Sequence, residues 1–583
     1  MEYERYLTSA RRCVLVMFFI IGVALPSSVW AQESKGASGS PAVKSSPATS
    51  NPLSSEVAAL KEQVARQQEQ MEKLRLALEA VTRRLDQSEG TKQASNPMLP
   101  ALGQVASTTP MAPTGVVRGA ESGGRLAASA TVPPVVSSAP IRPQAEESKP
   151  KSSPLSFRIG DAEFTPGGFM DFTTVFRTTN VGSGVATSFG TIPYSVIGGV
   201  PNTPGRMTEI RSLAQNSRIS LKIASKVGEN NVAGYAEADF AGNNPSSLFV
   251  TSNSSTLRLR LYFAQLMRGK FELLGGQGWS LMTPGRTGIS PWPADLFISQ
   301  VQDSNYQLGI TWGRQSQLRM VYHPSKEWAM AVSIENPNQY LSTGVVLPGS
   351  NFNSQFDMAG NQTTTPNLHP DIIAKVAYDP TIGGKHMHAE VGGILRSFRT
   401  FNSNNNTTST ITGGGAIAGV NFEVAKNFRL MAHGFYSYGG GRYILGLGPD
   451  VIVKPDGTLS GVHAGSIVTG FEYQPNPGLL FFGYYGGGYF QRNTGYSLDT
   501  SGNRIWVGFG GPATTTIQLN ANRAVQEPTF GITRTFWKSP KYGALMWVNQ
   551  YSYVTRAPWI VPSGSGKNAH LSVVYTDLRY VLP

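Results

Sequence analysis

Hydrophobic and polar residues alternate one by one through most of the chain from about residue 156 to the C-terminus. Between Thr256 and Leu266, the apolar face carries Leu257, Leu259, Leu261 and Phe263, and the other face carries Arg258, Arg260, Tyr262 and Ala264. Successive side chains of a strand point to opposite faces, so each such segment predicts a strand with one apolar and one polar face. A soluble sandwich and a membrane barrel both show this alternation.

The lengths of the connections separate these two folds. Short turns are predicted at 225–230, 268–270, 324–326, 379–385, 425–427, 474–478 and 538–541. Long polar or glycine-rich connections are predicted at 178–210, 241–255, 282–303, 336–369, 399–410, 441–460, 492–524 and 556–567. Short and long connections alternate strictly, as they do between periplasmic turns and external loops of outer-membrane barrels. The sequence therefore predicts an all-β fold, a sixteen-stranded antiparallel transmembrane barrel with both termini on the periplasmic side.

One segment could be read as one strand or as two. Residues 305–312 and 315–323 are both strand-like and flank Gly313. Counting both gives seventeen strands and puts the loop 336–369 on the wrong side, and an even count is the bacterial norm. We therefore predict one long strand over 305–323.

A different period precedes the barrel, over residues 53–87. Apolar residues recur there every 3 and 4 positions: Leu53, Val57, Leu60, Val64, Met71, Leu74, Leu78, Val81 and Leu85, with Gln67 as the polar exception. This heptad repeat predicts an α-helical coiled coil roughly 50 Å long. A single amphipathic helix packed on the barrel is the alternative, and the heptads do not choose between dimer and trimer.

The N-terminus predicts export. Arg11 and Arg12 precede an apolar run over 13–25, and Ala31 ends a segment of mostly small residues, as in a secretory signal peptide. We divide the chain into a signal peptide (1–31), a flexible tether (32–52), the periplasmic coiled coil (53–87), a Pro/Ser/Ala-rich linker (88–155) and the barrel (156–583).

Composition narrows the function classes. Of 583 residues only 15% are charged, with 49 Lys+Arg against 36 Asp+Glu, and the single cysteine excludes a disulfide framework. The basic residues are dispersed, which argues against nucleic-acid binding. His386 and His388 share a strand face without a third ligand at suitable spacing. We predict no enzyme activity, no catalytic residues, no cofactor and no metal.

Several short segments carry a family resemblance: Ser217–Ile219, Gly234–Phe240, Leu257–Arg260, Leu274–Ser280, Gly313–Arg319 and Ser333–Pro337. Together, residues 211–336 resemble the DcaP-like trimeric outer-membrane porins. The C-terminal Leu578–Pro583 fits the same resemblance, although it ends in proline rather than in an aromatic residue. The resemblance implies a sixteen-stranded barrel, a homotrimer and the uptake of small, often anionic, organic molecules.

In a lipid-embedded barrel the polar strand faces point inward. The pore-lining candidates are Arg218, Lys222, Glu237, Asp239, Arg258, Arg260, Tyr262, Gln317, Arg319 and Glu335. Arg258 and Arg260 would lie about 7 Å apart on one strand, as a basic ladder that guides anions. The alternative is a set of ion pairs with Glu237, Asp239 and Glu335.

The third long connection, 282–303, is stiffened by prolines and carries Arg286, Trp292 and Asp295. We name these three residues as candidates for a constriction loop that folds inward; a lid or a trimer latch is the alternative.

The sequence as a whole predicts an outer-membrane porin, a passive diffusion channel for small hydrophilic anionic solutes. Its expected partners are outer-membrane lipid, the solutes and two further copies of itself. The alternative function is an envelope tether, whose coiled coil links a barrel anchor to periplasmic partners or the cell wall.

Overall fold

The computed structural model describes residues 153–242, 255–297, 299–301, 307–358, 365–512 and 520–583. The predicted signal peptide, tether and coiled coil, and all but the last three residues of the predicted linker, lie outside these ranges. Among the described residues, no helix is long and apolar enough to cross a membrane.

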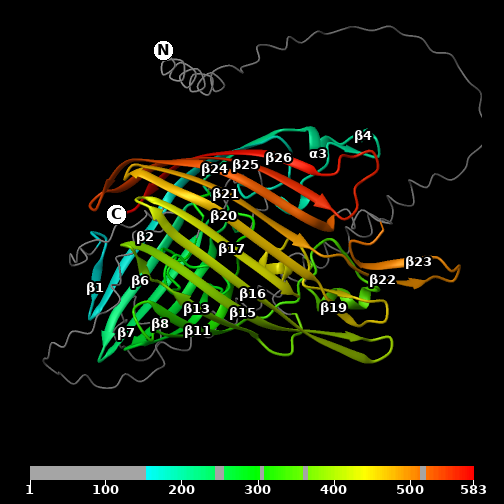
Figure 1. The fold of residues 1–583 in the computed structure, drawn as a ribbon, viewed down its shortest axis with the longest axis horizontal. Helices are drawn as coiled ribbons and strands as arrows, with labels where there is room; N and C mark the ends of the chain where they lie inside the picture. Colours follow the sequence, from blue (N-terminus) through cyan, green and yellow to red (C-terminus); the bar gives the residue numbers. More distant parts are fainter. Residues whose placement is uncertain (1–152, 243–254, 298, 302–306, 359–364, 513–519) are drawn as a thin grey trace, which may run out of the picture. The chain divides into compact units, whose positions relative to one another are not determined.

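The described residues form a closed antiparallel barrel with sixteen wall positions (Figure 1). The ring closes where β2 pairs with β26, from Phe169 opposite Val581 to Arg177 opposite Val573. The second wall position is split, because β5 pairs with one half of β2 and β6 with the other half. The wall consists of β2 (Ala162–Arg177), β5 (Glu209–Leu213) with β6 (Arg218–Val227), β7 (Asn230–Asp239), β8 (Arg258–Arg268), β9 (Phe271–Trp279), β10 (Arg314–Tyr322), β11 (Trp328–Glu335), β13 (Asp371–Tyr378), β15 (Lys385–Asn402), β16 (Thr407–Ala425), β17 (Phe428–Tyr438), β20 (His463–Asn476), β21 (Leu479–Phe490), β24 (Asn522–Ser539), β25 (Gly543–Pro558) and β26 (Ala569–Val581).

Short elements decorate the connections, most of them at the long-loop end. They are β1 (Phe157–Ile159), η1 (Phe189–Thr191), β3 (Val196–Ile197), β4 (Val200–Pro201), α3 (Thr203–Arg206), β12 (Val345–Val346), η2 (Ser350–Gln355), β14 (Thr381–Ile382), η3 (Gly441–Tyr443), β18 (Val451–Val453), β19 (Leu459–Gly461), β22 (Asn493–Leu498) and β23 (Arg504–Phe509). The hairpin of β22 and β23 extends beyond the wall at that end (Figure 1).

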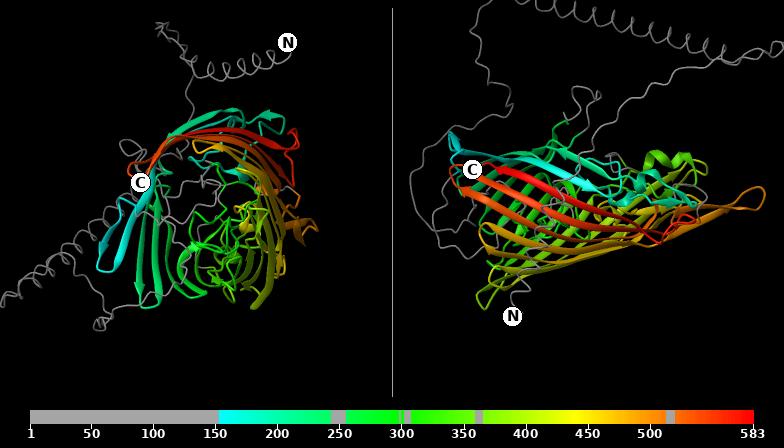
Figure 2. Two further views of the ribbon diagram at one scale, coloured as in Figure 1. Left: turned by 60° about the vertical axis from the view of Figure 1, so that its left-hand side comes forward. Right: turned by 90° about the horizontal axis from the view of Figure 1, so that it is seen from above.

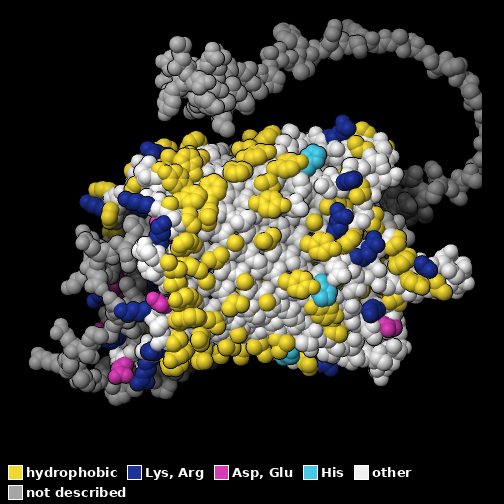
Figure 3. Space-filling view, viewed as in Figure 1, with side chains coloured by type: hydrophobic (Ala, Val, Ile, Leu, Met, Phe, Trp, Pro, Cys, Tyr) yellow, Lys and Arg dark blue, Asp and Glu magenta, His cyan; other side chains and the backbone are white. Residues whose placement is uncertain are grey.

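The outer surface of the barrel is apolar. Figure 3 shows hydrophobic side chains across this face, with lysine and arginine gathered towards the two ends. Exposed outward residues include Ile219, Leu259, Leu318, Met320, Val332, Ile334, Ile372, Leu430, Ile467 and Phe530. In water such a surface would be an aggregation hazard, whereas in a bilayer it matches the hydrocarbon.

The inside of the barrel is filled by loops. The left view of Figure 2 looks into the ring of strands and shows green and yellow segments of the long connections within it. They bury an apolar core that includes Leu308, Phe356, Tyr443, Ile444 and Val451, each no more than 1% exposed. The long connections therefore form a hydrophobic core inside the otherwise polar barrel.

The prediction of one long strand over 305–323 is wrong in its first part. β10 begins at Arg314, while Leu308 and Ile310 are fully buried within the barrel. A Cβ on Gly309 would lie 2.0 Å from the carbonyl oxygen of Ile467 on β20, so this segment packs directly against the far wall. A buried loop carries apolar residues, as the outward face of a strand in lipid does. The alternating apolar pattern therefore extends to Leu308 and Ile310, although the strand itself begins only at Arg314. The even strand count is unaffected.

The predicted long connection 399–410 is also wrong. β15 continues to Asn402 and β16 starts at Thr407, so a short hairpin joins them. The Asn/Thr/Ser-rich composition that indicated a loop belongs to strand ends with many exposed side chains.

Candidate functional site

The connection from β9 to β10, residues 280–313, is here called the inner loop. Its described residues, which include the constriction-loop candidates Arg286, Trp292 and Asp295, lie inside the barrel and contact opposite walls. The Trp292 ring lies against Lys222 of β6 and against Tyr235 and Phe263 of β7 and β8. Across the barrel, the Arg286 guanidinium bonds both carboxylate oxygens of Glu472 on β20, at 2.8 and 2.9 Å.

Arg286 and Glu472 are almost fully buried. Burial alone would lower the pKa of the Arg286 guanidinium, but the paired carboxylate of Glu472 raises it above its usual value. Asp295, by contrast, accepts a hydrogen bond from Ser290 at 2.8 Å within the inner loop itself.

Acidic residues of the wall, and Asp379 in the turn after β13, also bind the inner loop through its backbone. The amides of Leu281, Gly285, Gly288 and Leu308 donate to Glu335 (2.8 Å), Glu390 (3.1 Å), Asp379 (2.9 Å) and Glu527 (3.0 Å), respectively. Buried backbone amides need an acceptor, and a carboxylate is a strong one. Together with Glu472, these carboxylates fix the inner loop along its length.

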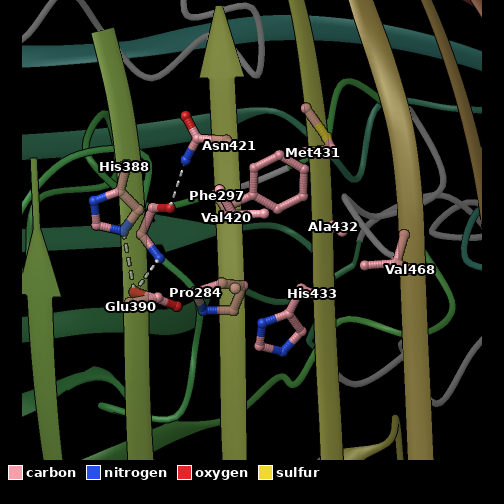
Figure 4. A pocket seen from close by; sticks show the side chains of 12 residues that line it. Pro284, Phe297, His388, Glu390, Val420, Asn421, Met431, Ala432, His433 and Val468 are labelled. Carbon is pink, nitrogen blue, oxygen red and sulfur yellow. Dashed lines mark hydrogen bonds and ion pairs between the residues drawn. The ribbon is translucent and has the colours of Figure 1, made fainter. Parts of the chain in front are cut away.

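The Glu390 anchor is the centre of a dense polar cluster (Figure 4). Its carboxylate also accepts from Lys375 at 3.0 Å and lies 3.3 Å from His388 Nε2, whose Nδ1 is 2.9 Å from Asp379. The cavity beside it, lined by Pro284, Phe297 and His433 among others, holds about 10 Å³. That volume suits about one water molecule. No group of three or more metal-ligating side chains occurs within the described part of the chain.

The predicted basic ladder is an ion-paired network. Arg260 Nε lies 2.6 Å from Glu237 and its Nη1 lies 2.7 Å from Asp239, which also binds Arg258 at 2.7 Å. Arg218 is 3.8 Å from Glu237. These arginines therefore take part in the ion pairs of the alternative interpretation. Glu335, the third partner considered, instead anchors the inner loop.

Tyr262 does not face the pore, so its prediction as a pore-lining residue is wrong. β7 residues 237 and 238 pair with Leu261 and Leu259, which leaves Arg260 as an extra residue in a β-bulge. After the bulge the faces are exchanged: Leu261 and Phe263 are buried inside, and Tyr262 is 63% exposed on the outer surface.

The other predicted residues face the interior. Gln317 and Arg319 lie on one face of β10, where Arg319 Nε donates to Gln317 Oε1 at 2.9 Å and a second nitrogen donates to the carbonyl of Trp279. Lys222 is half-buried under Trp292.

A second ion network, which sequence reasoning missed, holds the connection from β17 to β20. Asp371 of β13 binds Arg396 at 3.2 Å and Arg442 at 2.7 Å, and Arg396 also binds Asp450 at 2.9 Å. Burial raises the pKa of the Asp450 carboxyl, against the opposing effect of the two arginines. These residues lie up to 79 positions apart in the sequence, so local spacing carried no signal for them.

Sequence reasoning also missed a cavity of about 540 Å³ at the long-loop end, here called the mouth cavity. It is lined by Ala186–Thr191, Trp279, Trp312–Arg314, Tyr340, Ser342, Thr343, Leu445–Leu447, Asn520 and Asn522. The lining segments come from five different connections, which no linear motif brings together. Its volume lies within the usual range of ligand sites, roughly 300–1,000 Å³.

Hydrogen bonds between the connections hold the mouth cavity in shape. The Tyr340 hydroxyl donates to Gly446 O at 2.8 Å, and burial with the nearby carboxylates of Asp357 and Asp450 raises the pKa of that hydroxyl. Asn522 donates to Leu447 O at 3.1 Å, and the Trp312 amide donates to Tyr443 O at 3.0 Å.

No protein-family model matches the chain, and no curated protein matches it by sequence. Among solved structures, the outer-membrane channel DcaP of Acinetobacter baumannii matches with a TM-score of 0.53 and 16% identity, over 73% of this chain and 100% of that chain. The anion-selective porin from Comamonas acidovorans matches with a TM-score of 0.41 and 9% identity, over 72% of this chain and 100% of that one. The described residues thus have the fold of the DcaP channel, and the resemblance found in the sequence is confirmed at the level of the fold.

Proposed function

We propose that this protein is an outer-membrane channel through which small hydrophilic organic solutes diffuse passively, with a preference for anions. The observation that carries the proposal is a closed barrel with an apolar outer surface, many polar side chains inside and a cavity at one end. An apolar exterior suits lipid and a polar interior suits dissolved solutes. The shared fold of the DcaP channel supports the same conclusion.

The proposed anion preference rests on Arg319, one of the predicted pore-lining residues, and on Arg429, which was not predicted. Arg319 donates only to the neutral oxygens of Gln317 and Trp279, and Arg429 of β17 faces the interior. Within the described part of the chain, neither guanidinium lies within 4.0 Å of a carboxylate. Positive charge on inward-facing residues raises the local concentration of anions.

We also propose that three copies assemble through the barrel wall beside β2. A row of polar residues crosses the outer face of adjacent strands as direct cross-strand partners: Asn549 (β25), Thr576 (β26), Thr174 (β2) and Ser212 (β5). A polar row on an outward face is unfavourable against lipid, whereas another protein surface can pack and hydrogen-bond against it.

Planar-bilayer recording on the purified, unheated oligomer tests the proposal under a KCl gradient. We expect conductance in steps of three and an anion-selective reversal potential. Arg319→Gln with Arg429→Gln should abolish the selectivity, while Lys226→Gln, which removes an exposed charge at the short-turn end, should leave it unchanged. A correctly folded barrel without conductance would overturn the channel and favour the envelope tether.

A further inference from the structure

We infer that the outer face of the barrel, at its long-loop end, binds a phosphate group of the glycolipid in the outer leaflet of the membrane. The site lies where the ends of β21, β24 and β25 meet. It consists of Tyr489, Arg492, Arg523 and Trp559, here called the rim cluster. The inference goes beyond the proposed channel function, because it concerns the surrounding lipid rather than the solute. It depends on the support, the charge and the position of the rim cluster.

Trp559 is the fixed centre of the rim cluster. Its indole nitrogen donates to Phe490 O at 3.0 Å, and its backbone amide donates to Ala521 O at 2.9 Å. The Tyr489 ring meets the indole edge-on, with 6.2 Å between the ring centroids. The indole is therefore held both by the end of β21 and by the segment that leads into β24, and it offers a fixed aromatic face to cations.

Two arginines lie against this indole. The guanidinium carbons of Arg492 and Arg523 are 5.2 and 5.9 Å from its centroid, and both side chains are exposed. Arg523 is the extra residue of a β-bulge between Asn522 and Ala524. Among the described residues, neither guanidinium lies within 4.0 Å of a carboxylate. Contact with an aromatic face leaves the N–H groups of a guanidinium available, and their fork geometry suits phosphate oxygens.

The rim cluster adjoins an aromatic belt on the outer surface. Tyr436 of β17 and Tyr489 both lie opposite Gly465 of β20, and they are 63% and 48% exposed. Ile467 of β20 and Phe530 of β24 belong to the exposed apolar surface beyond this belt. Aromatic belts mark the level at which the hydrocarbon of a bilayer meets the lipid head groups. The two arginines therefore lie at the level of lipid phosphates, where Figure 3 shows lysine and arginine bordering the apolar face.

A phosphate carried by a lipid suits this position better than a dissolved phosphate. Two cations beside an exposed apolar surface match a ligand that has an anionic head group and apolar chains. The long-loop end of an outer-membrane barrel faces the cell exterior, and the outer leaflet there consists of phosphorylated glycolipid. A dissolved phosphate would contact the two arginines without gaining the apolar contact.

Native mass spectrometry of the purified oligomer, titrated with lipid A in detergent, measures this binding. Arg492→Gln with Arg523→Gln should raise the dissociation constant of lipid A about thirtyfold, since two basic groups at a charged lipid surface contribute about that factor. Dephosphorylated lipid A should bind the unchanged protein and the double variant equally weakly. An excess of inorganic phosphate should not displace lipid A from the unchanged protein.

Lys541→Gln is the matched control. Lys541 is exposed and lies 5.1 Å from the Tyr542 ring, in the turn that joins β24 and β25 at the opposite end of the barrel. Its loss should leave the binding of lipid A unchanged.

An equal loss of binding in Lys541→Gln and the double variant, or displacement of lipid A by inorganic phosphate, would overturn the inference. Unchanged binding of lipid A to the double variant would also overturn it. If that variant then lost its oligomeric state on a native gel, the rim cluster would be a contact with a second copy of the chain instead.

Discussion

Two regions of the barrel interior use arginine in opposite ways. On β6–β8, Arg218 and Arg260 are buried against the carboxylates of Glu237 and Asp239. Their positive charges are therefore paired, and the ion pairs hold neighbouring strands together. In the mouth cavity, Arg314 lies among aromatic and neutral polar groups with no acidic lining residue in the described chain. The difference shows that arginines on inward faces can have different surroundings, carboxylates in one region and aromatic and neutral polar groups in the other.

The largest expected effect comes from breaking the paired region. Arg260→Met should lower the free energy of unfolding by about 3–5 kcal/mol, because it leaves Glu237 and Asp239 buried without their main partner. The urea midpoint of the purified barrel in detergent measures this loss. Arg258→Gln is the control, since its side chain is 39% exposed and its loss should cost about 1 kcal/mol or less. Equal effects of the two variants would show that burial does not set the strength of the network.

The β8 bulge brings Arg260 into that network, and a neighbouring pair of residues tests it. Leu261→Ala should cost about 2–5 kcal/mol because Leu261 is fully buried inside the barrel. Tyr262→Ala should cost much less, since that side chain is exposed on the outer surface. The same urea titration reports both variants. A larger loss for Tyr262→Ala would restore the regular alternation predicted from the sequence.

The inner loop extends between the two regions, and its anchors can be weakened one at a time. Glu335→Gln replaces the charged acceptor of the Leu281 amide and should cost about 1–3 kcal/mol. Greater noise in the open-channel current, together with faster proteolysis within 282–303, would show that the loop has loosened. Glu272→Gln, on the same side of the barrel without a bond to the inner loop, should leave both measurements unchanged.

The smallest effect on stability is expected at the mouth. Arg314→Gln should change the free energy of unfolding by less than about 0.5 kcal/mol, because its side chain is only partly buried and none of the described residues that line the cavity is acidic. The urea midpoint again measures it. A loss as large as that of Arg260→Met would show that Arg314 is structural and would remove the contrast between the two regions.

Much of the wall could be predicted from the sequence because a barrel in lipid requires apolar and polar residues to alternate along each strand. It also requires short turns and long loops to alternate between the strands. That logic located Ile219, Val332 and Ile334 on the outer surface and the loops on alternate ends. It failed at Arg260, where one extra residue exchanged the two faces of β8, and at Leu308, where a buried loop kept the apolar pattern of a strand.

The candidate site was less accessible to sequence reasoning. Glu237 and Asp239 were recognised as possible partners of Arg258 and Arg260 because they lie on a neighbouring strand. The mouth cavity was missed because Ser188, Trp312 and Asn520 come from connections with no shared motif. The hydrogen bond from the Leu308 amide to Glu527 forms only in the folded barrel, and it leaves no periodic pattern in the sequence.

The carboxylate anchors of the inner loop imply an order of assembly. The loop follows β9, yet its acceptors Glu390, Glu472 and Glu527 come from strands 105 to 219 residues away from the groups they bind. Contacts of such long sequence separation form late, after the chain between them has been organised. The inner loop should therefore reach its place only once β24 has joined the wall.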